Sequence, residues 1–185
     1  MVYSLTTPIS KEDIKKLHIG DIVLISGTIY TARDAAHKRL VELIKEGKEL
    51  PLDLKDAIIY YVGPTPAKPN QAIGSAGPTS SYRMDAYLEE IMKQGSLISI
   101  GKGPRDSFVK DLIKEHGGLY LSTIGGAAAS IGKSVTKRDL VAYPDLGAEA
   151  IQKLEVKDFY AIVTYDSHGG DLFESGINDY LNSQK

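Results

Sequence analysis

Short apolar runs rich in β-branched residues alternate along this chain with charged stretches of amphipathic spacing, a pattern typical of an α/β domain. The first kind predicts strands at 21–30, 57–62, 97–100, 119–123, 140–143 and 160–165. The second kind predicts helices at 33–46, 79–94, 106–115 and 148–154, after a short helix that begins at Ser10 and ends near Leu17. Since no repeat and no second domain is visible, we expect one domain over residues 1–185, with a frayed tail at 176–185.

Composition narrows the possible partners. Of 185 residues, 42% are hydrophobic and 25% are charged, as in a globular protein, and the formal net charge of −2 gives no reason to expect nucleic-acid binding. No stretch approaches the roughly 18 to 20 apolar residues of a membrane span. The polar segment 1–17 does not resemble a signal or transit peptide. We therefore expect a cytoplasmic protein that contacts no membrane.

Three segments share one design, in which a predicted strand and a glycine-containing turn lead into a helix start with cationic or hydroxyl side chains. They are residues 27–37, 77–83 and 101–106. A helix start presents free N–H groups and the positive end of the helix dipole, so it attracts anions. Arg33 and Arg83 stand where acidic residues would be more favourable, which indicates a bound anion such as a carboxylate. The alternative is that each arginine is structural or solvated, with Arg33 paired to an acidic neighbour.

Hydroxyl side chains gather in the second of these segments. Thr79, Ser80 and Ser81 follow a Gly-Pro pair, and one of the three is expected to be the helix N-cap. The other two are available to hydrogen-bond a substrate carboxylate or hydroxyl. The preceding segment, 63–78, is rich in proline, glycine, alanine and serine, and loops of this length are usually functional or disordered.

Other motifs favour structural roles. His37 lies four residues after Arg33 on the same helix face, and a single helical histidine is more often packed or at the surface than catalytic. The remaining histidines show no spacing that suggests a metal site, so no metal ligand is expected. The sequence DSHG at 166–169 lacks an accompanying G-x-S-x-G elbow and is interpreted as a turn. The small residues of 125–130 match no nucleotide-binding fingerprint, which leaves close packing as their role.

Taken in order, these segments resemble the β subunit, or C-terminal domain, of class I fumarases and of the related L-tartrate dehydratases. The resemblance rests on SGTIYTARDAAHKRL, IIYYVGPTPAKPNQAIGSAGPTSSYRMD, ISIGKGPRD, IGGAAASI, YPDLGAEAI and KDFYAIVTYDSHG. These stretches cover nearly the whole chain from Asp21 to Gly169. The segments ARDAAHKR and GPT-x-x-x-RMD are the most specific of them.

The resemblance implies a swivelling β/β/α domain with a mixed sheet and flanking helices. In that family an α chain or N-terminal domain holds a [4Fe–4S] cluster with one iron open to substrate, and the β part closes over it. The substrate-binding residues implied here are Arg33, Thr79, Ser80, Arg83 and Lys102, with Thr79 as the candidate for proton transfer. Ser80 stands where the family pattern has threonine, which keeps the hydroxyl but loses a methyl contact.

The cysteine count fits such a division between two chains. There is no cysteine, so this chain supplies no disulfide, no thiolate ligand and no cysteine nucleophile. If the chain takes part in iron–sulfur chemistry, every cluster thiolate must come from a partner α subunit.

The activity that the resemblance implies is the reversible hydration of fumarate to malate, on a C4 dicarboxylate substrate. Dehydration of tartrate is the alternative within the same class. Two alternatives of other classes stay open, namely a non-catalytic carboxylate- or phosphate-binding module and a purely structural assembly subunit. The first would bind its ligand alone, and the second would tolerate replacement of Arg33 and Arg83. A homo-oligomer of the β chain also stays open.

Overall fold

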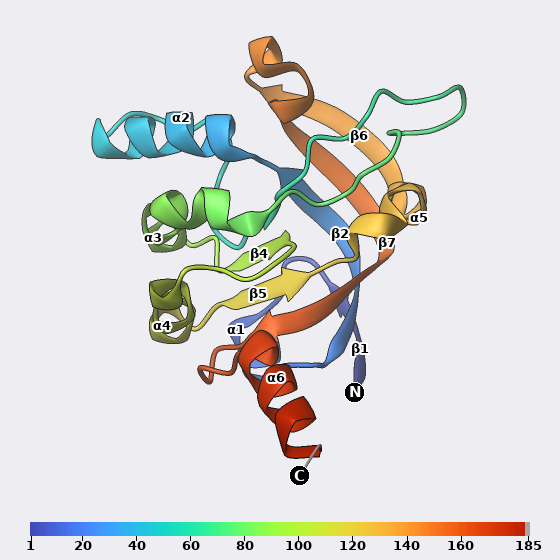
Figure 1. Cartoon of the computed structure of the whole chain (residues 1–185). Helices are drawn as coiled ribbons and strands as arrows, with labels where there is room; N and C mark the ends of the chain where they lie inside the picture. Colours follow the sequence, from blue (N-terminus) through green and yellow to red (C-terminus); the bar gives the residue numbers. More distant parts are fainter. Residues whose placement is uncertain (184–185) are drawn as a thin grey trace.

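Seven strands form one mixed sheet in the computed structural model, which describes residues 1–183 (Figure 1). The strands are β1 (Val2–Thr6), β2 (Ile22–Thr31), β3 (Ile58–Tyr60), β4 (Ile98–Gly101), β5 (Leu119–Ser122), β6 (Val135–Ala142) and β7 (Ile151–Tyr165). The α-helices are α1 (Lys11–Lys16), α2 (Asp34–Lys45), α3 (Asp85–Lys93), α4 (Ser107–His116), α5 (Ala128–Lys133) and α6 (Leu172–Ser183). Short 3₁₀ helices lie between them: η1 (Ser81–Met84), η2 (Gly125–Ala127) and η3 (Pro144–Glu149).

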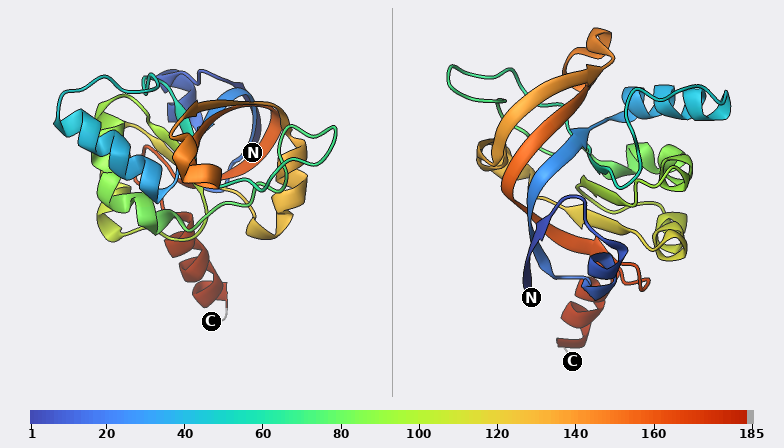
Figure 2. Two further views of the ribbon diagram at one scale, coloured as in Figure 1. Left: turned by 90° about the horizontal axis from the view of Figure 1, so that it is seen from above. Right: turned by 180° about the vertical axis from the view of Figure 1, so that it is seen from behind.

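The sheet closes on itself. Its strand order is β1-β2-β3-β4-β5-β7-β6, and β2 also pairs with β7. The pairs from β1 to β5 are parallel, whereas β7 runs antiparallel to β2, β5 and β6. Strands β2, β3, β4, β5 and β7 therefore form a closed ring, to which β1 and β6 are added. The β6–β7 arch rises on the side of the ring away from α2, α3 and α4 (Figure 2).

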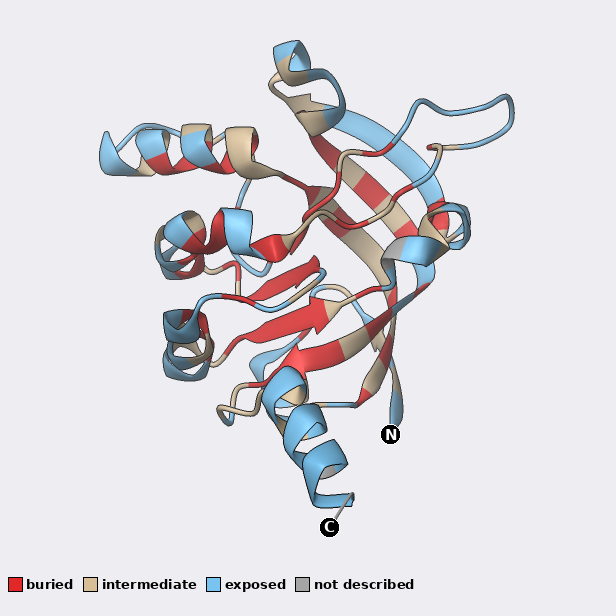
Figure 3. Cartoon of the chain, in the orientation of Figure 1, coloured by how far each residue is buried: buried red, intermediate tan, exposed pale blue. Residues whose placement is uncertain are grey.

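Alternate side chains of the short parallel strands point into two different cores. In β3, Ile58 and Tyr60 belong to the cluster inside the ring, whereas Ile59 and the next residue after the strand, Tyr61, belong to the cluster beneath α2 and α3. A period of two is expected for a strand buried on both faces. Tyr60 meets Phe159 of β7 edge to face at 5.1 Å. Figure 3 shows these central strands buried, with the helices exposed on their outer side.

The α/β class and the mixed sheet with flanking helices are confirmed, but the predicted helix at 148–154 is wrong. The chain leaves η3 at Glu149 and enters β7 at Ile151. Ile151 and Leu154 are three residues apart, which is also the spacing of apolar residues on one face of a helix. Both are buried in a strand that pairs with β2 on one side and β6 on the other. The strands expected at 140–143 and 160–165 are the last parts of β6 and β7.

The two ends of the chain also differ from expectation. The pattern predicts no strand before Ser10, yet β1 pairs with β2 as an edge strand whose side chains alternate in exposure. The structure has α6 over 172–183, where the sequence predicts a frayed tail from 176; residues 184–185 of that tail lie outside the described residues. Within residues 1–183, no helix has the length and apolar character needed to cross a membrane.

The long segment 63–78 leaves the ring after β3 and returns to it, and hydrogen bonds join its outgoing and returning parts. Val62 and Pro78 form an antiparallel bridge at its base, and the Thr65 amide donates to the Ser75 carbonyl (3.0 Å). The loop also packs on the small residues near α5, because a Cβ at Gly132 would come within 2.4 Å of a loop carbonyl. Glycine at this position is what permits the close approach.

Candidate functional site

The predicted site residues lie where parallel strands of the ring end. Arg33 follows β2, the loop 61–80 follows β3, and Lys102 follows β4. Because these strands are parallel neighbours, their carboxyl ends meet at one edge of the sheet. Ligands of α/β sheets bind outside such carboxyl ends. The topology therefore brings together residues that are far apart in the sequence.

Backbone contacts fix the hydroxyl segment to this edge. The Thr79 amide donates to the Tyr61 carbonyl (2.8 Å), and Ser80 forms a parallel bridge with Lys102. Thr79 and Ser80 are half-buried, and their hydroxyls make no hydrogen bond within the part of the chain that the structure describes. Both hydroxyls are therefore available to a ligand.

The third hydroxyl of this group, Ser81, is structural. Its side chain is fully buried, and its Oγ accepts from the Lys102 amide (3.0 Å) and lies 3.0 Å from the Tyr120 hydroxyl. A Cβ at Gly101 would come within 1.9 Å of Ser81 Oγ, so glycine is required there. Ser80 is the cap residue of η1, but its side chain makes no capping hydrogen bond. The expected capping role of one hydroxyl is thus replaced by a buried contact of Ser81.

Arg33 is the N-cap residue of α2, and its guanidinium is partly paired. Nη2 lies 3.1 Å from Glu149 Oε1 and 3.7 Å from Asp34 Oδ1. Nε is buried without a hydrogen-bond partner among the described residues. Nη1 lies over Gly63, where a Cβ would come within 3.3 Å of it. The side chain is 22% exposed, so part of the guanidinium can still meet a ligand.

The other two predicted cations, Arg83 and Lys102, have exposed side chains. No carboxylate lies within ion-pairing distance of either one among residues 1–183, in contrast to Arg33. Lys102 is adjacent to Ser80, whereas Arg83 lies further along, in η1. The structure therefore brings Arg33, Thr79, Ser80 and Lys102 to one edge and leaves Arg83 beside it.

The prediction that cations occupy the first turns of the helices is wrong. Arg33 stands before the first turn of α2, which Asp34 occupies. Arg83 lies in the last turn of η1, and the acidic residue Asp85 opens α3. Both helices thus carry the charge that the helix dipole favours at its start. The support for an anion site is instead the partly paired Arg33, the exposed Lys102 and two hydroxyls without a partner among the described residues, all at one sheet edge.

A buried ion pair behind this edge was not identified from the sequence. Arg105 Nε donates to Asp85 Oδ1, and both side chains are at most 2% exposed. The Asp106 amide donates to the other oxygen of Asp85 (2.8 Å). The guanidinium also lies over the rings of Tyr61 (5.4 Å) and Tyr120 (5.0 Å). Arg105, one of the two cations of the third segment, is therefore bound by the fold, and no pattern along the chain signals its partner.

His37 is packed in the interior, which agrees with the expectation that a single helical histidine is more often structural than catalytic. It is 1% exposed, its Nδ1 lies 2.9 Å from the Arg33 carbonyl, and its ring meets Tyr61 edge to face at 5.3 Å. Because a carbonyl only accepts, Nδ1 is the donor in this contact. Burial lowers the pKa of His37 to about 4, so the ring is neutral near pH 7.

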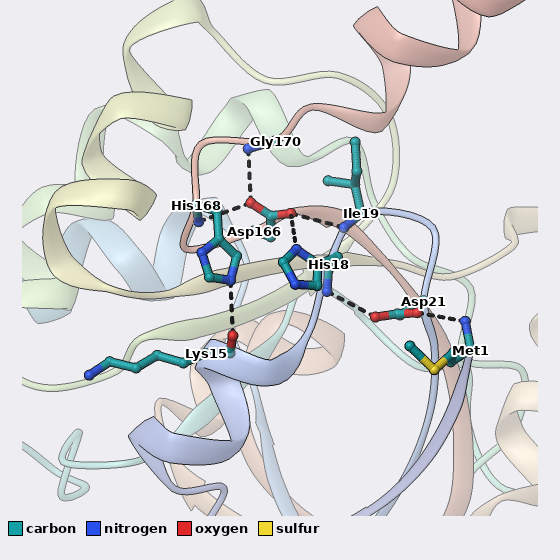
Figure 4. A network of polar contacts seen from close by, with 8 residues as sticks. All are labelled: Met1, Lys15, His18, Ile19, Asp21, Asp166, His168 and Gly170. Atoms are coloured by element: carbon teal, nitrogen blue, oxygen red, sulfur yellow. Dashed lines mark hydrogen bonds and ion pairs between the residues drawn. The ribbon is translucent and has the colours of Figure 1, made fainter.

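Two other histidines meet at the opposite end of the ring (Figure 4). The rings of His18 and His168 stack with centroids 4.5 Å apart, and His168 Nε2 lies 2.9 Å from the Lys15 carbonyl. The carboxylate of Asp166 accepts from three backbone amides at 2.8 to 2.9 Å. Its role is therefore to hold a turn, and not to orient a histidine as a catalytic base. The interpretation of DSHG as a turn is confirmed. No group of three or more ligand-type side chains that could hold a metal is found over residues 1–183.

The site is an open edge rather than an enclosed cavity. A hollow of about 570 Å³ lies between the loop 63–78 and α5, with Lys68 and Lys133 in its lining, but none of the five predicted residues lines it. This hollow is therefore separate from the edge that carries the predicted residues.

A family model described as the fumarase C-terminus matches residues 2–176. The chain belongs to this family. All five predicted site residues fall within the matched range, and the resemblance expected from the sequence is confirmed.

Relatives in the fumarase C-terminus family differ in length. The chain is 46% identical over 156 residues to the anaerobic class I fumarate hydratase of Escherichia coli, covering 83% of this chain and 28% of that protein. It is 40% identical over 177 residues to fumarate hydratase 2 of Leishmania major, covering 94% and 31%. It is 42% identical over 172 residues to a putative L(+)-tartrate dehydratase subunit beta of Methanocaldococcus jannaschii, covering 90% and 88%. The chain thus spans less than a third of those two fumarate hydratases.

Proposed function

We propose that this chain is the β part of a cytoplasmic hydro-lyase that interconverts fumarate and malate, together with an α subunit that carries a [4Fe–4S] cluster. The observation that carries the proposal is the gathering of Arg33, Thr79, Ser80 and Lys102 at one open sheet edge in a fumarase C-terminus chain. A C4 dicarboxylate has two anionic groups, which the partly paired Arg33 and the exposed Lys102 at this edge can hold at once.

The roles of the side chains follow from their chemistry. Arg33 offers Nη1, the nitrogen that is neither held by Glu149 nor buried, for one carboxylate, and Lys102 with Arg83 offers charge for the other. Ser80 and Thr79 can donate hydrogen bonds that fix the orientation of the carbon chain between them. We assign proton transfer to Thr79. A threonine hydroxyl is a weak acid and a weak base, so this role requires a group of the partner subunit beside it.

The donors of this chain do not fit an iron–sulfur cluster. It has no cysteine, and thiolates are the ligands that such clusters use. The proposal therefore places the cluster on the α subunit. That subunit corresponds to the more than two-thirds of the two fumarate hydratases that this chain does not cover.

Dehydration of tartrate is the second candidate. The Methanocaldococcus jannaschii relative bears that name as a beta subunit, and the alignment covers 88% of it. Malate and tartrate differ by one hydroxyl, and the same cations and hydroxyls would serve both substrates.

The test is co-expression with a neighbouring reading frame that encodes well-spaced cysteines, followed by anaerobic purification and assays with fumarate, malate and tartrate. We expect the two chains to co-purify, the complex to hydrate fumarate, and the isolated chain to be inactive. Activity with tartrate alone would select the second candidate. An inactive complex with an intact cluster, beside an isolated chain that binds dicarboxylates by calorimetry, would show a non-catalytic binding module.

A further inference from the structure

We infer that Glu149 is a positioning residue for Arg33, and that it determines how Arg33 meets a substrate carboxylate. This inference rests on the proposed function, since it adds a residue to the same site. Glu149 Oε1 lies 3.1 Å from Arg33 Nη2, and the two side chains are 28% and 22% exposed. The pair is thus half-buried at the edge of the site, where a charged hydrogen bond is stronger than on an open surface.

The backbone next to Glu149 is fixed to the strand that leads to Arg33. Thr31 Oγ1 donates to the Ala150 carbonyl (3.1 Å) and accepts from the Gln152 amide (3.0 Å). Thr31 lies two residues before Arg33, so one fully buried hydroxyl joins the two segments. Glu149 is therefore held at a defined position relative to the guanidinium.

A second arginine of α2 holds the other end of η3. Both terminal nitrogens of Arg39 pair with the carboxylate of Asp145 (3.0 and 2.5 Å), and its guanidinium lies over the Tyr143 ring at 5.0 Å. Arg39 and Asp145 do not contact Arg33, so they provide a matched control. Replacing Asp145 loosens the same segment without removing the Glu149 carboxylate.

The contact decides which nitrogens of Arg33 remain for a ligand. Nη2 is held by Glu149, and Nε is buried. Nη1 is therefore the nitrogen that remains for a ligand, and it lies over Gly63, at the start of the loop that leads back to Thr79. Without Glu149, the nearest carboxylate would be Asp34, whose side chain is 40% exposed and now lies 3.7 Å away. The guanidinium would then turn toward the start of α2 and away from Gly63.

Two opposite effects can be separated by the sign of the change in KM. If Glu149 positions Arg33, its loss weakens substrate binding and raises KM. If Glu149 merely competes with the substrate for Arg33, its loss removes a negative charge and lowers KM. The buried Nε and the confinement by Gly63 favour positioning, because a half-buried guanidinium needs a fixed partner to keep its orientation.

The experiment measures kcat and KM of the anaerobic complex with its active dicarboxylate, for Glu149→Ala, Glu149→Gln, Asp145→Asn and the reference Arg33→Ala. We expect KM to rise roughly 10-fold in Glu149→Ala, as for loss of a charged hydrogen bond, with kcat within about twofold. Glu149→Gln should be intermediate because its Oε1 still accepts, and Asp145→Asn should match the wild type. An unchanged or lowered KM in Glu149→Ala would overturn the inference.

The reference variant separates two kinds of failure. If Arg33→Ala lowers kcat/KM and Glu149→Ala does not, only the inference fails; if Arg33→Ala has no effect, the proposed site fails. For variants that assemble poorly, the isolated chain gives a second readout, the NMR signal of the Arg33 Nε–H group. That signal should move in Glu149→Gln and stay in Asp145→Asn, and an unmoved signal in Glu149→Gln would contradict the positioning role.

Discussion

Ser81 and Lys102 are joined by two hydrogen bonds: the Ser81 amide donates to the Lys102 carbonyl (3.1 Å), and the Lys102 amide donates to Ser81 Oγ (3.0 Å). This pair connects the segment after the long loop with the end of β4. The parallel backbone bridge between Ser80 and Lys102 lies beside it. The candidate edge therefore depends on a serine that is itself fully buried.

Replacing Ser81 with alanine should destabilise the fold, because the part-buried Lys102 amide would lose its acceptor. We expect the free energy of unfolding to fall by about 1–3 kcal/mol, measured by chemical denaturation of the isolated chain. Ser80→Ala is the matched control, since the Ser80 hydroxyl makes no hydrogen bond in the described structure, and its effect should stay within about 0.5 kcal/mol. Equal destabilisation by the two changes would contradict the assigned roles.

Stability should depend on pH through His37. Its pKa is about 4 in the folded chain and 6.5 in the unfolded chain, so the unfolded state binds the proton more readily between these values. The contribution of neutral His37 is fully present above pH 6.5 and is lost as pH falls toward 4. The shift corresponds to roughly 3 kcal/mol. Denaturation at several pH values gives the free energy of unfolding as a function of pH. Between pH 4 and 6.5 this free energy should change less steeply with pH in His37→Gln than in the wild type, and an equal pH dependence would refute the assignment.

Arg83 should contribute to substrate binding although it forms no ion pair among residues 1–183. In Arg83→Ala we expect kcat/KM of the complex to fall. The loss should correspond to about 2–4 kcal/mol of transition-state stabilisation, the cost of removing one partner of a charged contact. Arg138→Ala, which removes an exposed arginine of β6, should leave the kinetics unchanged. An unchanged kcat/KM in Arg83→Ala would remove Arg83 from the site.

The Thr79 hydroxyl should affect the chemical step. Thr79→Val keeps the shape and the backbone hydrogen bond to Tyr61 but removes the hydroxyl, and we expect kcat to fall roughly 100-fold, as for loss of a general acid or base. Thr79→Ser should retain most of the rate because it keeps the hydroxyl. If Thr79→Val raises KM and leaves kcat unchanged, Thr79 only binds substrate.

Much of the fold follows from local pattern. Ser10 accepts from the Asp13 amide as the N-cap of α1, and the apolar stripe of 33–46 becomes the buried face of α2. The helix predicted at 148–154 does not form. Two apolar residues three positions apart favour a helix, but the pairing of β7 with β2 on one side and β6 on the other outweighs that local preference. The sequence pattern does not predict β1, because an edge strand buries little and its alternation is weak.

The candidate site was predictable only in part. Motif resemblance selects Arg33, Thr79 and Lys102, and parallel strand order brings them to one edge. Glu149, the partner of Arg33, comes from a distant segment, and only the closed ring places it there. Asp85, which pairs with Arg105 behind the edge, is placed by the packing of α3. Such contacts leave no spacing in the sequence from which they could be inferred.

The central claim is that this chain supplies the carboxylate-binding groups of a two-part hydro-lyase. It is tested most directly by kcat/KM for fumarate in the anaerobic complex carrying Arg33→Ala and Lys102→Ala, singly and together, with cluster content and assembly verified. We expect each single change to lower kcat/KM roughly 30-fold or more, and the double change to lower it further. Wild-type kcat/KM in the assembled double variant would contradict the claim and would show a chain that serves only assembly.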